Sequence, residues 1–448
     1  MTKRSLPQMN FAVIRGRHKG TTLYTLVTLL LLILYLQGIP ALTRLEYTFE
    51  DQLRRQSPLV GDRDNFAIVG IDSQSIAAVG EWPWNHGTMS DLLITICDYQ
   101  PQAVMLDFPL VEKAEEFLSG KSGELALSIR ECGNVVIPFD LVVAKQGKLS
   151  RVAPSYLRSF AIPATDADLL KRLPVAAAVF IPPKLLAAGA KGVGFSYYEA
   201  DSDDKIRCAN LLINYEGSIY PSAPLQLAAI CLGSNPQEIA LKDNRHIHIA
   251  GRDVPIDNHG RMLLRFPEKM VDFRTCSAID VLTGEVEMGL LAGKTIIITT
   301  TEPQHTVSLK TAAIEAMPAH AYAATIVQNV MSDKFVSRFE LPLPVDLLLL
   351  LVIGITGTLI LPGFKLTYRL IILATGAAFL LGASFLLFAS YSVLLPIVYP
   401  LLTITLLLAI SPAIKRIETK AGYNADVAAG SAGQLVATGV AGNEEVCL

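Results

Sequence analysis

Residues 68–87 read IVGIDSQSIAAVGEWPWNHG, and this stretch indicates how the largest domain of the chain is built. An apolar run ends in an acid, Asp72, and a short helix-forming segment follows it. Trp82 and Trp84, the only two tryptophans of the chain, then flank Pro83. A short apolar strand that leads directly into a helix is typical of α/β domains, so we expect one here.

The same alternation of short apolar runs and helical stretches continues along the chain and predicts a mixed sheet with helices on its faces. The strand candidates are residues 66–71, 103–107, 135–139, 192–197 and 295–300, and the helix candidates are residues 88–99, 123–130, 223–231 and 320–331. Two hairpin-like units turn near Glu216-Gly217 and near Asn258-His259-Gly260, where small or Asn-type residues tolerate positive φ. We expect an extra β-rich part between about residues 190 and 270.

The chain as a whole is too apolar for one soluble domain of its length. Hydrophobic residues make up 51% of the 448 residues and charged residues only 18%. Apolar runs of about 20 residues are long enough to cross a bilayer, and four of them predict an α-helical transmembrane region of four spans. The expected parts are a cytoplasmic N-terminus at 1–20, spans at 21–42, 341–361, 370–390 and 393–413, an extracytoplasmic domain at 43–340, and a short flexible cytoplasmic tail at 414–448.

Basic residues orient these spans, because loops rich in Lys and Arg stay in the cytoplasm. Such residues precede the first span, separate the second from the third and follow the fourth: Lys3, Arg4, Arg15, Arg17, Lys19, Lys365, Arg369, Lys415, Arg416 and Lys420. Both termini are therefore expected in the cytoplasm. The protein is expected in the cytoplasmic (inner) membrane, with the large domain periplasmic or extracellular.

The segment after the first span predicts a helical stalk. Leu45, Phe49 and Leu53 are spaced four apart, and no Gly or Pro interrupts the run before Pro58. We expect the first membrane helix to continue outside the bilayer through this segment.

Several segments together resemble the extracytoplasmic sensor family known as CHASE, second type. The most specific is IVGIDSQSIAAVGEWPW, which is similar to the family's opening strand, acid, short helix and Gly-x-Trp-Pro-Trp signature. Others agree in order: LEYTFEDQLRRQ, AVMLDF, ADSDDKIRCANLLINYEGSIYPSAPLQLA, VPIDNHGRMLLRF, LLAGKTIIITTTEP and MPAHAYAATIVQNVM. The resemblance covers about residues 45–335 and implies a bacterial sensor domain followed by three membrane helices.

The chain departs from the family pattern at two loops and at its end. The family's Ile-Gly, with a later Asp and Thr-Pro, is replaced by Ile298-Thr299-Thr300 and EPQHTVSLKTAA, and Asp107 is followed by Pro109-Leu110-Val111 rather than by acidic, Phe-containing residues. If these loops hold a ligand, the ligand or its affinity differs here. About 35 residues follow the last expected span, too few for the cyclase or kinase that relatives carry, so a separate protein is expected to give the output.

Acids at strand ends are candidate ligand contacts. Asp72 and Asp107 end two successive strand candidates, and ligand crevices in α/β domains form at the carboxyl ends of strands. If the two ends are adjacent, the carboxylates could bind a cation or polar ligand together. Each acid could equally cap the helix or loop that follows it.

The nearby aromatic residues are candidates for the same site. Pro83 is expected to hold the chain extended, which places the rings of Trp82 and Trp84 on opposite sides, with one ring in the core and the other open to a ligand or partner. His86 follows them closely and completes the predicted ligand-binding set.

An acidic segment from Glu199 to Asp204 suggests calcium, but it lacks the Gly and the distant Glu of a calcium loop. We expect an acidic turn in which Asp203 and Arg207 have structural roles. His246 and His248 share one face of a strand, yet no further ligand follows at metal-binding spacing, so a polar surface is favoured.

The spacing of the cysteines does not indicate a disulfide framework. Five lie in the external segment at irregular spacings, namely Cys97, Cys132, Cys208, Cys231 and Cys276, and Cys447 lies in the tail. Buried thiols are favoured, and a disulfide stays open as an alternative.

These observations favour a sensor that is not an enzyme. The sequence contains no GxSxG, HExxH, Walker or Rossmann motif, and no catalytic, metal or cofactor site is expected. The net charge of −3 does not indicate a nucleic-acid surface. We expect a membrane-anchored sensor or sensory subunit that binds an unknown ligand or partner outside and signals through its membrane helices to a separate protein, with homo-oligomerisation left open. The alternative is a structural or assembly membrane protein that uses the sensor fold as a scaffold.

The expected spans themselves look built for packing rather than transport. They contain no Lys, Arg or Glu at mid-depth, where ion and solute pathways need such groups. Gly354 with Gly357, and Ala378 with Gly382, give small faces that allow neighbouring helices to approach closely.

Overall fold

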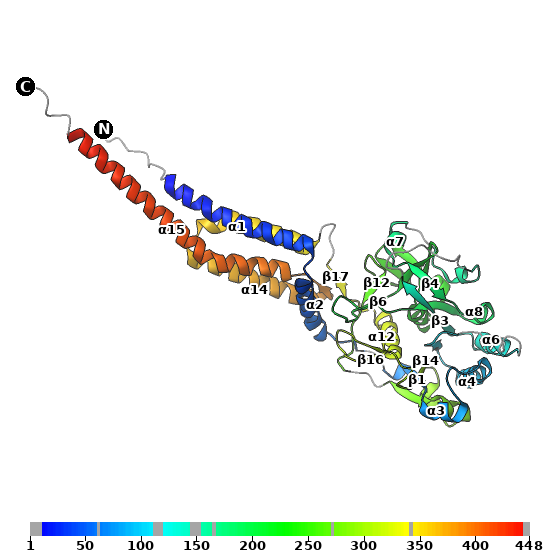
Figure 1. Cartoon of the computed structure of the whole chain (residues 1–448). Helices are drawn as coiled ribbons and strands as arrows, with labels where there is room; N and C mark the ends of the chain where they lie inside the picture. Colours follow the sequence, from blue (N-terminus) through cyan, green and yellow to red (C-terminus); the bar gives the residue numbers. More distant parts are fainter. Residues whose placement is uncertain are drawn as a thin grey trace, which may run out of the picture. The chain divides into compact units, whose positions relative to one another are not determined.

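The chain divides into two compact units, each described here by itself. The computed structural model describes residues 11–60, 63–110, 120–143, 154–163, 167–269, 273–339 and 344–441. One unit consists of Met1–Glu50 and Arg338–Leu448, and the other of Asp51–Ser337. Long helices dominate the first unit, whereas the second is a mixed α/β domain (Figure 1).

The α/β domain is built on a seven-stranded mixed sheet. Its strand order is β13-β1-β14-β2-β3-β4, and β5 also pairs with β3. The pairs are parallel except that of β3 with β4. The strands are β1 (Phe66–Ile71), β2 (Ala103–Leu106), β3 (Val135–Val143), β4 (Ala176–Phe180), β5 (Gly192–Ser196), β13 (Arg274–Ser277) and β14 (Thr295–Thr300). The five predicted strands are confirmed, whereas β4 and β13 were not predicted.

Helices cover both faces of this sheet. All six residues of β1 are buried, as expected for a strand of a parallel sheet that is covered on both sides. Successive side chains point to opposite faces, so Phe66 and Ile68 enter one core and Ala67 and Val69 the other. The first core contains α9 (Ala223–Cys231) and α12 (Ala319–Ser332), and the second contains α4 (His86–Asp98), α6 (Lys121–Cys132), α8 (Lys184–Gly189) and α10 (Ala278–Thr283).

The extra β-rich part is confirmed as a set of small sheets. They pair β6 (Cys208–Asn210) with β12 (Arg261–Leu263), β7 (Leu212–Tyr215) with β8 (Ser218–Pro221), and β9 (Ala240–Asp243), β10 (His246–Ile249) and β11 (Arg252–Pro255) with one another. A further small sheet, which lies outside the predicted part, pairs β15 (Ser308–Leu309) with β16 (Met317–Pro318). The predicted hairpin at Glu216-Gly217 joins β7 to β8. The one predicted at 258–260 is wrong, because β11 pairs with β10 and β12 pairs with β6.

Short helices complete this domain. They are η1 (Arg63–Asn65), α3 (Ser73–Val79), η2 (Leu157–Phe160), α7 (Ala167–Arg172), η3 (Pro236–Glu238) and α11 (Met288–Leu291). The two histidines of β10 lie on its polar face, where His246 pairs with Asp243 and His248 with Asp253. Both ion pairs are exposed, as the sequence predicts.

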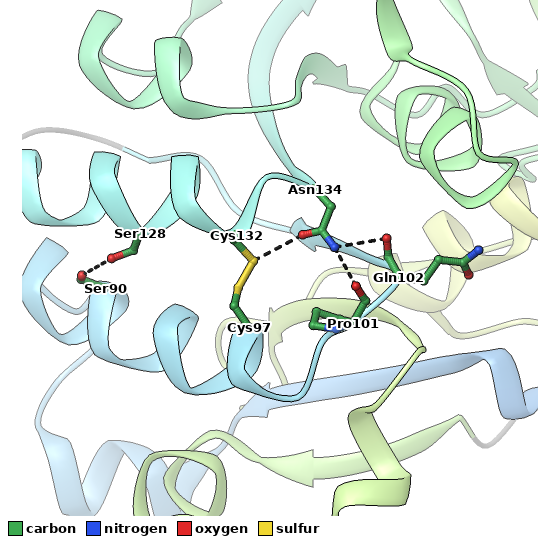
Figure 2. The surroundings of a disulfide bond; sticks show 7 residues. All are labelled: Ser90, Cys97, Pro101, Gln102, Ser128, Cys132 and Asn134. Atoms are coloured by element: carbon green, nitrogen blue, oxygen red, sulfur yellow. Dashed lines mark hydrogen bonds between the residues drawn. A yellow bond between two sulfur atoms is a disulfide. The ribbon is translucent and has the colours of Figure 1, made fainter.

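A disulfide joins the ends of two helices on one face of the sheet. Cys97 of α4 and Cys132 of α6 are bonded, with their Cα atoms 5.6 Å apart. Figure 2 shows Asn134 beside this bond, with its amide nitrogen donating to the carbonyl oxygens of Pro101 and Gln102. The sequence left this disulfide as the less favoured alternative. The thiols of Cys208, Cys231 and Cys276 are buried, as the favoured prediction had it, and Cys447 lies outside the described residues.

The first unit contains the long apolar helices of the chain. These are α1 (Phe11–Gln37), α13 (Val345–Ile360), α14 (Leu366–Tyr391) and α15 (Val398–Ala441), joined by α2 (Pro40–Arg55), η4 (Leu361–Gly363), β17 (Ser337–Arg338) and β18 (Val393–Leu394). Tyr24, Leu373 and Leu407 share one apolar cluster, so α1, α14 and α15 pack together. Gly354 and Gly357 serve this packing, since an added Cβ would lie 2.2 Å from Thr28 and 2.8 Å from Leu407.

The prediction of four spans is wrong. Among the described residues, Leu366–Tyr391 and Val398–Lys420 are long and apolar enough to cross a membrane, and the bent pair Thr21–Gln37 with Pro40–Arg55 makes a third candidate. The helix α13 has only 16 residues, fewer than the roughly 20 that a bilayer requires. The chain is therefore a membrane protein with two to three candidate spans.

Three further expectations for this unit need correction. The stalk is helical as predicted, but it does not continue the first membrane helix, because that helix breaks at Gly38, whose φ is 62°, and α2 leaves at an angle of 84°. The predicted flexible tail is helical as far as Ala441. Arg369, assigned to a basic loop, lies within α14, is 0% exposed and pairs with Glu418 at 2.7 Å.

Candidate functional site

A pocket lies at the carboxyl ends of four strands of the main sheet. We call it the carboxyl-edge pocket, and its volume is about 600 Å³. Asp107 follows β2, Asp140 lies in β3, Tyr197 and Tyr198 follow β5, and Thr300 ends β14. Ligands of α/β domains bind at this edge of a sheet because the loops that leave the strands form a crevice there.

Asp107 is the most perturbed acid of the pocket. It is half-buried, and the hydroxyl of Thr299 donates to its Oδ2 at 3.1 Å. Burial, and to a smaller extent the charge of Asp140, raise the pKa of Asp107 to about 7 against the lowering effect of that hydrogen bond. Near neutral pH this carboxyl group is therefore close to the midpoint of its titration.

The other polar groups of the pocket come from neighbouring strands. Asp140 of β3 lies beside Ser196 of β5 and Phe180 of β4 in the sheet register. Burial raises the pKa of Asp140. Burial, with the charges of Asp107 and Asp140, also raises the pKa of Tyr198. Two carboxyl groups and a tyrosine hydroxyl thus influence one another across this space.

Aromatic rings form one wall of the pocket. Trp82 and Phe108 both line it, and their ring centroids are 4.8 Å apart in an edge-to-face arrangement. Trp84 is 7% exposed, and its Nε1 donates to the carbonyl oxygen of Gly80 at 2.9 Å. The Trp82–Pro83 peptide bond is cis. The ring centroids of Trp82 and Trp84 are 5.9 Å apart in an edge-to-face arrangement. The prediction of rings on opposite sides of the chain is wrong, whereas one ring does enter the core.

The pocket continues inward as a small recess. Six residues line both spaces, among them Asp107, Tyr197 and Tyr198. The recess, of about 20 Å³, is also lined by Asn210 of β6. Asn210 is 3% exposed, and neither polar atom of its side chain has a hydrogen-bond partner among the described residues.

Not all predicted site residues meet at this pocket. Trp82 and Asp107 line it, whereas Asp72, Trp84 and His86 do not. The strands that end in Asp72 and Asp107 are separated by β14, so the idea that these two ends are adjacent is wrong. His86 is buried at the start of α4, where its Nδ1 lies 2.9 Å from the hydroxyl of Ser122.

Asp72 instead caps α3. Its Oδ1 accepts hydrogen bonds from the backbone nitrogen of Ser75 at 2.8 Å, from the hydroxyl of Ser75 at 2.7 Å and from that of Ser277 at 2.9 Å. Although burial raises the pKa of Asp72, these hydrogen bonds together outweigh it, and the pKa is lowered. This is the capping role that the sequence left open as the alternative.

Sequence reasoning missed several residues of the pocket. The acid of Asp140 interrupts the run VVIPFDLVV, and two tyrosines follow directly after the strand of residues 192–196. A charged residue inside a buried strand is a signal that could have identified Asp140. His305 falls in the loop where the chain departs from its family pattern, and it lines the pocket with an exposed side chain.

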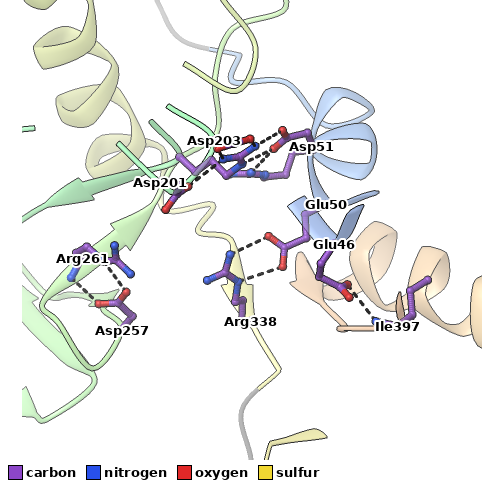
Figure 3. A network of polar contacts seen from close by, with 11 residues as sticks. Glu46, Glu50, Asp51, Asp201, Asp203, Asp257, Arg261, Arg338 and Ile397 are labelled. Carbon is purple, nitrogen blue, oxygen red and sulfur yellow. Dashed lines mark hydrogen bonds and ion pairs between the residues drawn. The ribbon is translucent and has the colours of Figure 1, made fainter. Parts of the chain in front are cut away.

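The acidic turn forms a buried ion cluster with α2. Arg207 is 1% exposed, and its guanidinium donates to both carboxylate oxygens of Asp203 at 2.7 Å and to Asp201 at 3.0 Å. It also binds Asp51 at 2.8 and 3.0 Å, and Figure 3 labels the three aspartates of this cluster, Asp51, Asp201 and Asp203. Asp51 in turn accepts from Arg54 at 2.6 Å. Asp203 and Arg207, which the sequence expects to have structural roles in this turn, bind each other, whereas the contact with Asp51 was not foreseen.

Comparison with known families agrees with this architecture. A family model for the CHASE2 domain matches residues 26–361. The chain belongs to the CHASE2 family. CHASE2 is an extracytoplasmic sensor domain, typically non-catalytic, and here it accompanies candidate membrane helices. No curated protein and no solved structure gives a significant match to the chain. Within the described residues, no group of three or more His, Cys, Asp or Glu side chains could hold a metal ion.

Proposed function

We propose that this CHASE2 protein is a sensory subunit that binds a small ligand in the carboxyl-edge pocket and signals through its membrane helices to a separate protein. The observation that carries the proposal is the pocket itself. Its volume of about 600 Å³ falls within the range of roughly 300–1,000 Å³ that is usual for small-molecule sites. Apolar rings and a few convergent polar groups line it, which is also typical of such sites.

An oxidising compartment for the domain agrees with this role. The disulfide between Cys97 and Cys132 is of a kind that persists outside the cytoplasm. Arg15, Arg17 and Lys19 precede the apolar part of α1, and basic residues hold such an end in the cytoplasm. We place the N-terminus inside and the α/β domain outside the cytoplasmic membrane.

The proposed route out of the pocket is the segment that follows β5. Tyr197 and Tyr198 line the pocket, and the chain then runs through the acidic turn to Arg207, which binds Asp51 of α2. A ligand that contacts the two tyrosines would bias the position of this segment. The ligand can shift the equilibrium between two arrangements of this segment only by the difference in its affinity for them.

Helix α2 is suited to receive that bias because it contributes residues to both units, which meet in sequence after Glu50. In the membrane unit, Glu50 pairs with Arg338 at 2.9 Å. One helical turn earlier, Glu46 accepts hydrogen bonds from the backbone nitrogens of Ile397 and Val398, at the start of α15. The middle of the helix is thus held within the membrane unit by hydrogen bonds at Glu46 and by an ion pair at Glu50, as Figure 3 shows.

The test is crosslinking in cells of the full-length chain. Asp140→Asn alters the pocket, and Asp91→Asn makes the same change at an exposed position of α4. We expect one separate protein to crosslink to the wild-type chain, and its yield to change in Asp140→Asn but not in Asp91→Asn. Recovery of the same protein with equal yield from all three chains would favour the scaffold alternative. Recovery of only this polypeptide would refute a sensory subunit.

A further inference from the structure

The charges of the carboxyl-edge pocket indicate the class of its ligand, an inference that rests on the function proposed above. Among the described residues that line the pocket, Asp107 and Asp140 are acids, and none is Lys or Arg. His305 also lines it, with an exposed side chain. These described residues therefore offer negative charge with no fixed positive charge among them to balance it. An anionic ligand would meet like charge there and be disfavoured.

The rings of the pocket favour the same kind of ligand. Trp82, Phe108, Tyr197 and Tyr198 contribute four aromatic side chains, and Phe180 adds a fifth that is 62% exposed. Aromatic faces attract cations through their quadrupole, most strongly in the case of tryptophan. The aromatic rings can also bury the apolar body of a ligand. A bound ligand would then cover the exposed ring of Phe180.

The inner recess supplies an observation that is independent of charge. Asn210 is 3% exposed, and both its Nδ2 and its Oδ1 lack a hydrogen-bond partner among the described residues. Leaving a buried amide unsatisfied is costly, so such a group in a native fold indicates a water or ligand that completes it. The recess has room for about one water-sized group, at about 20 Å³. A polar end of a ligand, directly or through one water, can meet this amide.

We propose that the carboxyl-edge pocket binds an organic cation, namely a protonated amine or quaternary ammonium compound with an apolar body. Its charged nitrogen pairs with Asp107 and Asp140, and its apolar body packs on Trp82 and Tyr198. A polar end directed inward completes the hydrogen bonding of Asn210. A metal ion fits less well, because hard cations require six or more oxygen ligands and two carboxylates converge here among the described lining residues.

The protonation of Asp107 adds a signature to this proposal. Its pKa of about 7 leaves the carboxyl group partly protonated at neutral pH, because burial disfavours the charged form. A bound cation favours the ionised form, so binding should release a fraction of a proton near pH 7. A neutral ligand of the same shape should not.

Tryptophan fluorescence offers a direct test, since Trp82 and Trp84 are the only tryptophans in the chain and Trp82 lines the pocket. The full-length chain in nanodiscs is titrated with two cations, choline and phenethylamine. Their neutral counterparts are 3,3-dimethyl-1-butanol and 2-phenylethanol, and phenylacetate is the anion of matched shape. We expect saturable quenching by at least one cation, about tenfold weaker binding of its neutral counterpart, and no binding of phenylacetate.

Matched variants assign the effect to the pocket. Asp107→Asn and Asp140→Asn should each weaken binding of the cation about tenfold, and Asp91→Asn should leave it unchanged. Thermal unfolding of each variant verifies that it is folded, and Asp140→Glu should retain binding. Proton release, measured by calorimetry in buffers of different ionisation enthalpy, should accompany binding of the cation only.

The outcomes separate this inference from the proposed function. If the neutral compound or phenylacetate binds as tightly as the cation, and Trp82→Leu abolishes that binding, the pocket stands and the class of ligand proposed here is wrong. If no compound quenches, the organic-cation proposal is overturned, while the crosslinking of Asp140→Asn still decides the sensory role. Equal binding by wild type and Asp140→Asn would also overturn it.

Discussion

The strands β1 and β2 both end in an aspartate at the same edge of the same sheet, yet the two acids have different environments. Asp72 accepts three hydrogen bonds and has a lowered pKa, whereas Asp107 accepts one from Thr299 and has a pKa raised to about 7. The residues that follow explain the difference. Ser75 places a backbone nitrogen and a hydroxyl at the third position after Asp72, which is where a helix cap needs donors.

Asp107 is followed by Phe108 and Pro109, and a residue that precedes proline is disfavoured in helical conformation. No helix cap therefore forms at Asp107 as it does at Asp72, and its carboxyl group faces the pocket instead. One acid stabilises the fold, and the other is left available for a ligand. The predictions below test this contrast.

The largest effect should separate the two tryptophans that lie near these strand ends. Trp84→Ala removes a ring that is 7% exposed and leaves a cavity, so it should lower the free energy of unfolding by about 3–5 kcal/mol. Trp82→Ala removes a half-buried ring of the pocket and should cost clearly less while it abolishes quenching by the cation. Thermal unfolding of the full-length chain measures both. Equal losses of stability would contradict the division between core and pocket.

The two acids should respond in opposite ways to substitution. Asp72→Ala removes a helix cap and should destabilise the domain by about 0.5–2 kcal/mol. Asp107→Asn should not destabilise it at neutral pH, because it relieves the burial of a charge and retains the shape of the side chain. The measurement is the melting temperature of each variant at pH 7.5. A larger loss in Asp107→Asn than in Asp72→Ala would show that Asp107 is the structural acid.

The pH dependence should also have opposite signs. The lowered pKa of Asp72 contributes stability that is fully present above the unfolded-state value of about 4 and is lost as the pH falls from there through the lowered folded-state pKa. The raised pKa of Asp107 has the reverse effect, so stability should fall as the pH rises from about 4 to about 7. Melting curves of wild type and Asp107→Asn between these values isolate the second contribution. A slope that is identical in the two proteins would contradict the raised pKa.

Ligand binding adds a further pH effect at the same group. Binding of a cation should strengthen as the pH rises through about 7, because Asp107 must be ionised to attract it. Asp140, Tyr197, Tyr198 and His305 also line the pocket. Titrations of Asp107→Asn should show a weaker dependence on pH, and His305→Gln separates the contribution of the histidine.

The smallest expected effect concerns the inner recess. Asn210→Leu replaces an amide that lacks partners with an apolar side chain of similar size and should raise the stability of the unliganded protein by about 1 kcal/mol. It should also weaken binding of choline, whose hydroxyl can reach the recess, more than that of phenethylamine. A loss of stability in Asn210→Leu would mean that the amide is already satisfied in the unliganded protein.

The sequence predicted the elements of the domain better than their arrangement. The strands at 66–71 and 295–300 were predicted with their observed bounds, because short runs rich in apolar and β-branched residues and bounded by polar residues are a local signal. The order of the strands depends on contacts between distant segments. No local sequence pattern indicates that β14 lies between β1 and β2. The prediction that Asp72 and Asp107 lie at adjacent strand ends was wrong for this reason.

The same limit applies to the pocket and to the membrane unit. Trp82 and Asp107 could be chosen from local patterns, but Tyr198 and Asp140 join them only through the pairing of β3 with β5. In the membrane unit, hydropathy identified the apolar helices, yet it could not show that α13 stops after 16 residues or that Gly38 bends the chain. Helix length and direction depend on local breaks, and hydropathy averaged over a stretch of about 20 residues conceals such breaks.

The central claim is that occupancy of the pocket reaches α2 through the segment between Tyr198 and Arg207. Hydrogen exchange of the full-length chain in nanodiscs tests it, with phenethylamine at a concentration that saturates the fluorescence change. We predict slower exchange at residues 197–207 and at Asp51–Arg55, and no such change in Asp140→Asn. Saturated binding with protection confined to the residues around Trp82 and Asp107, and none in α2, would contradict the account.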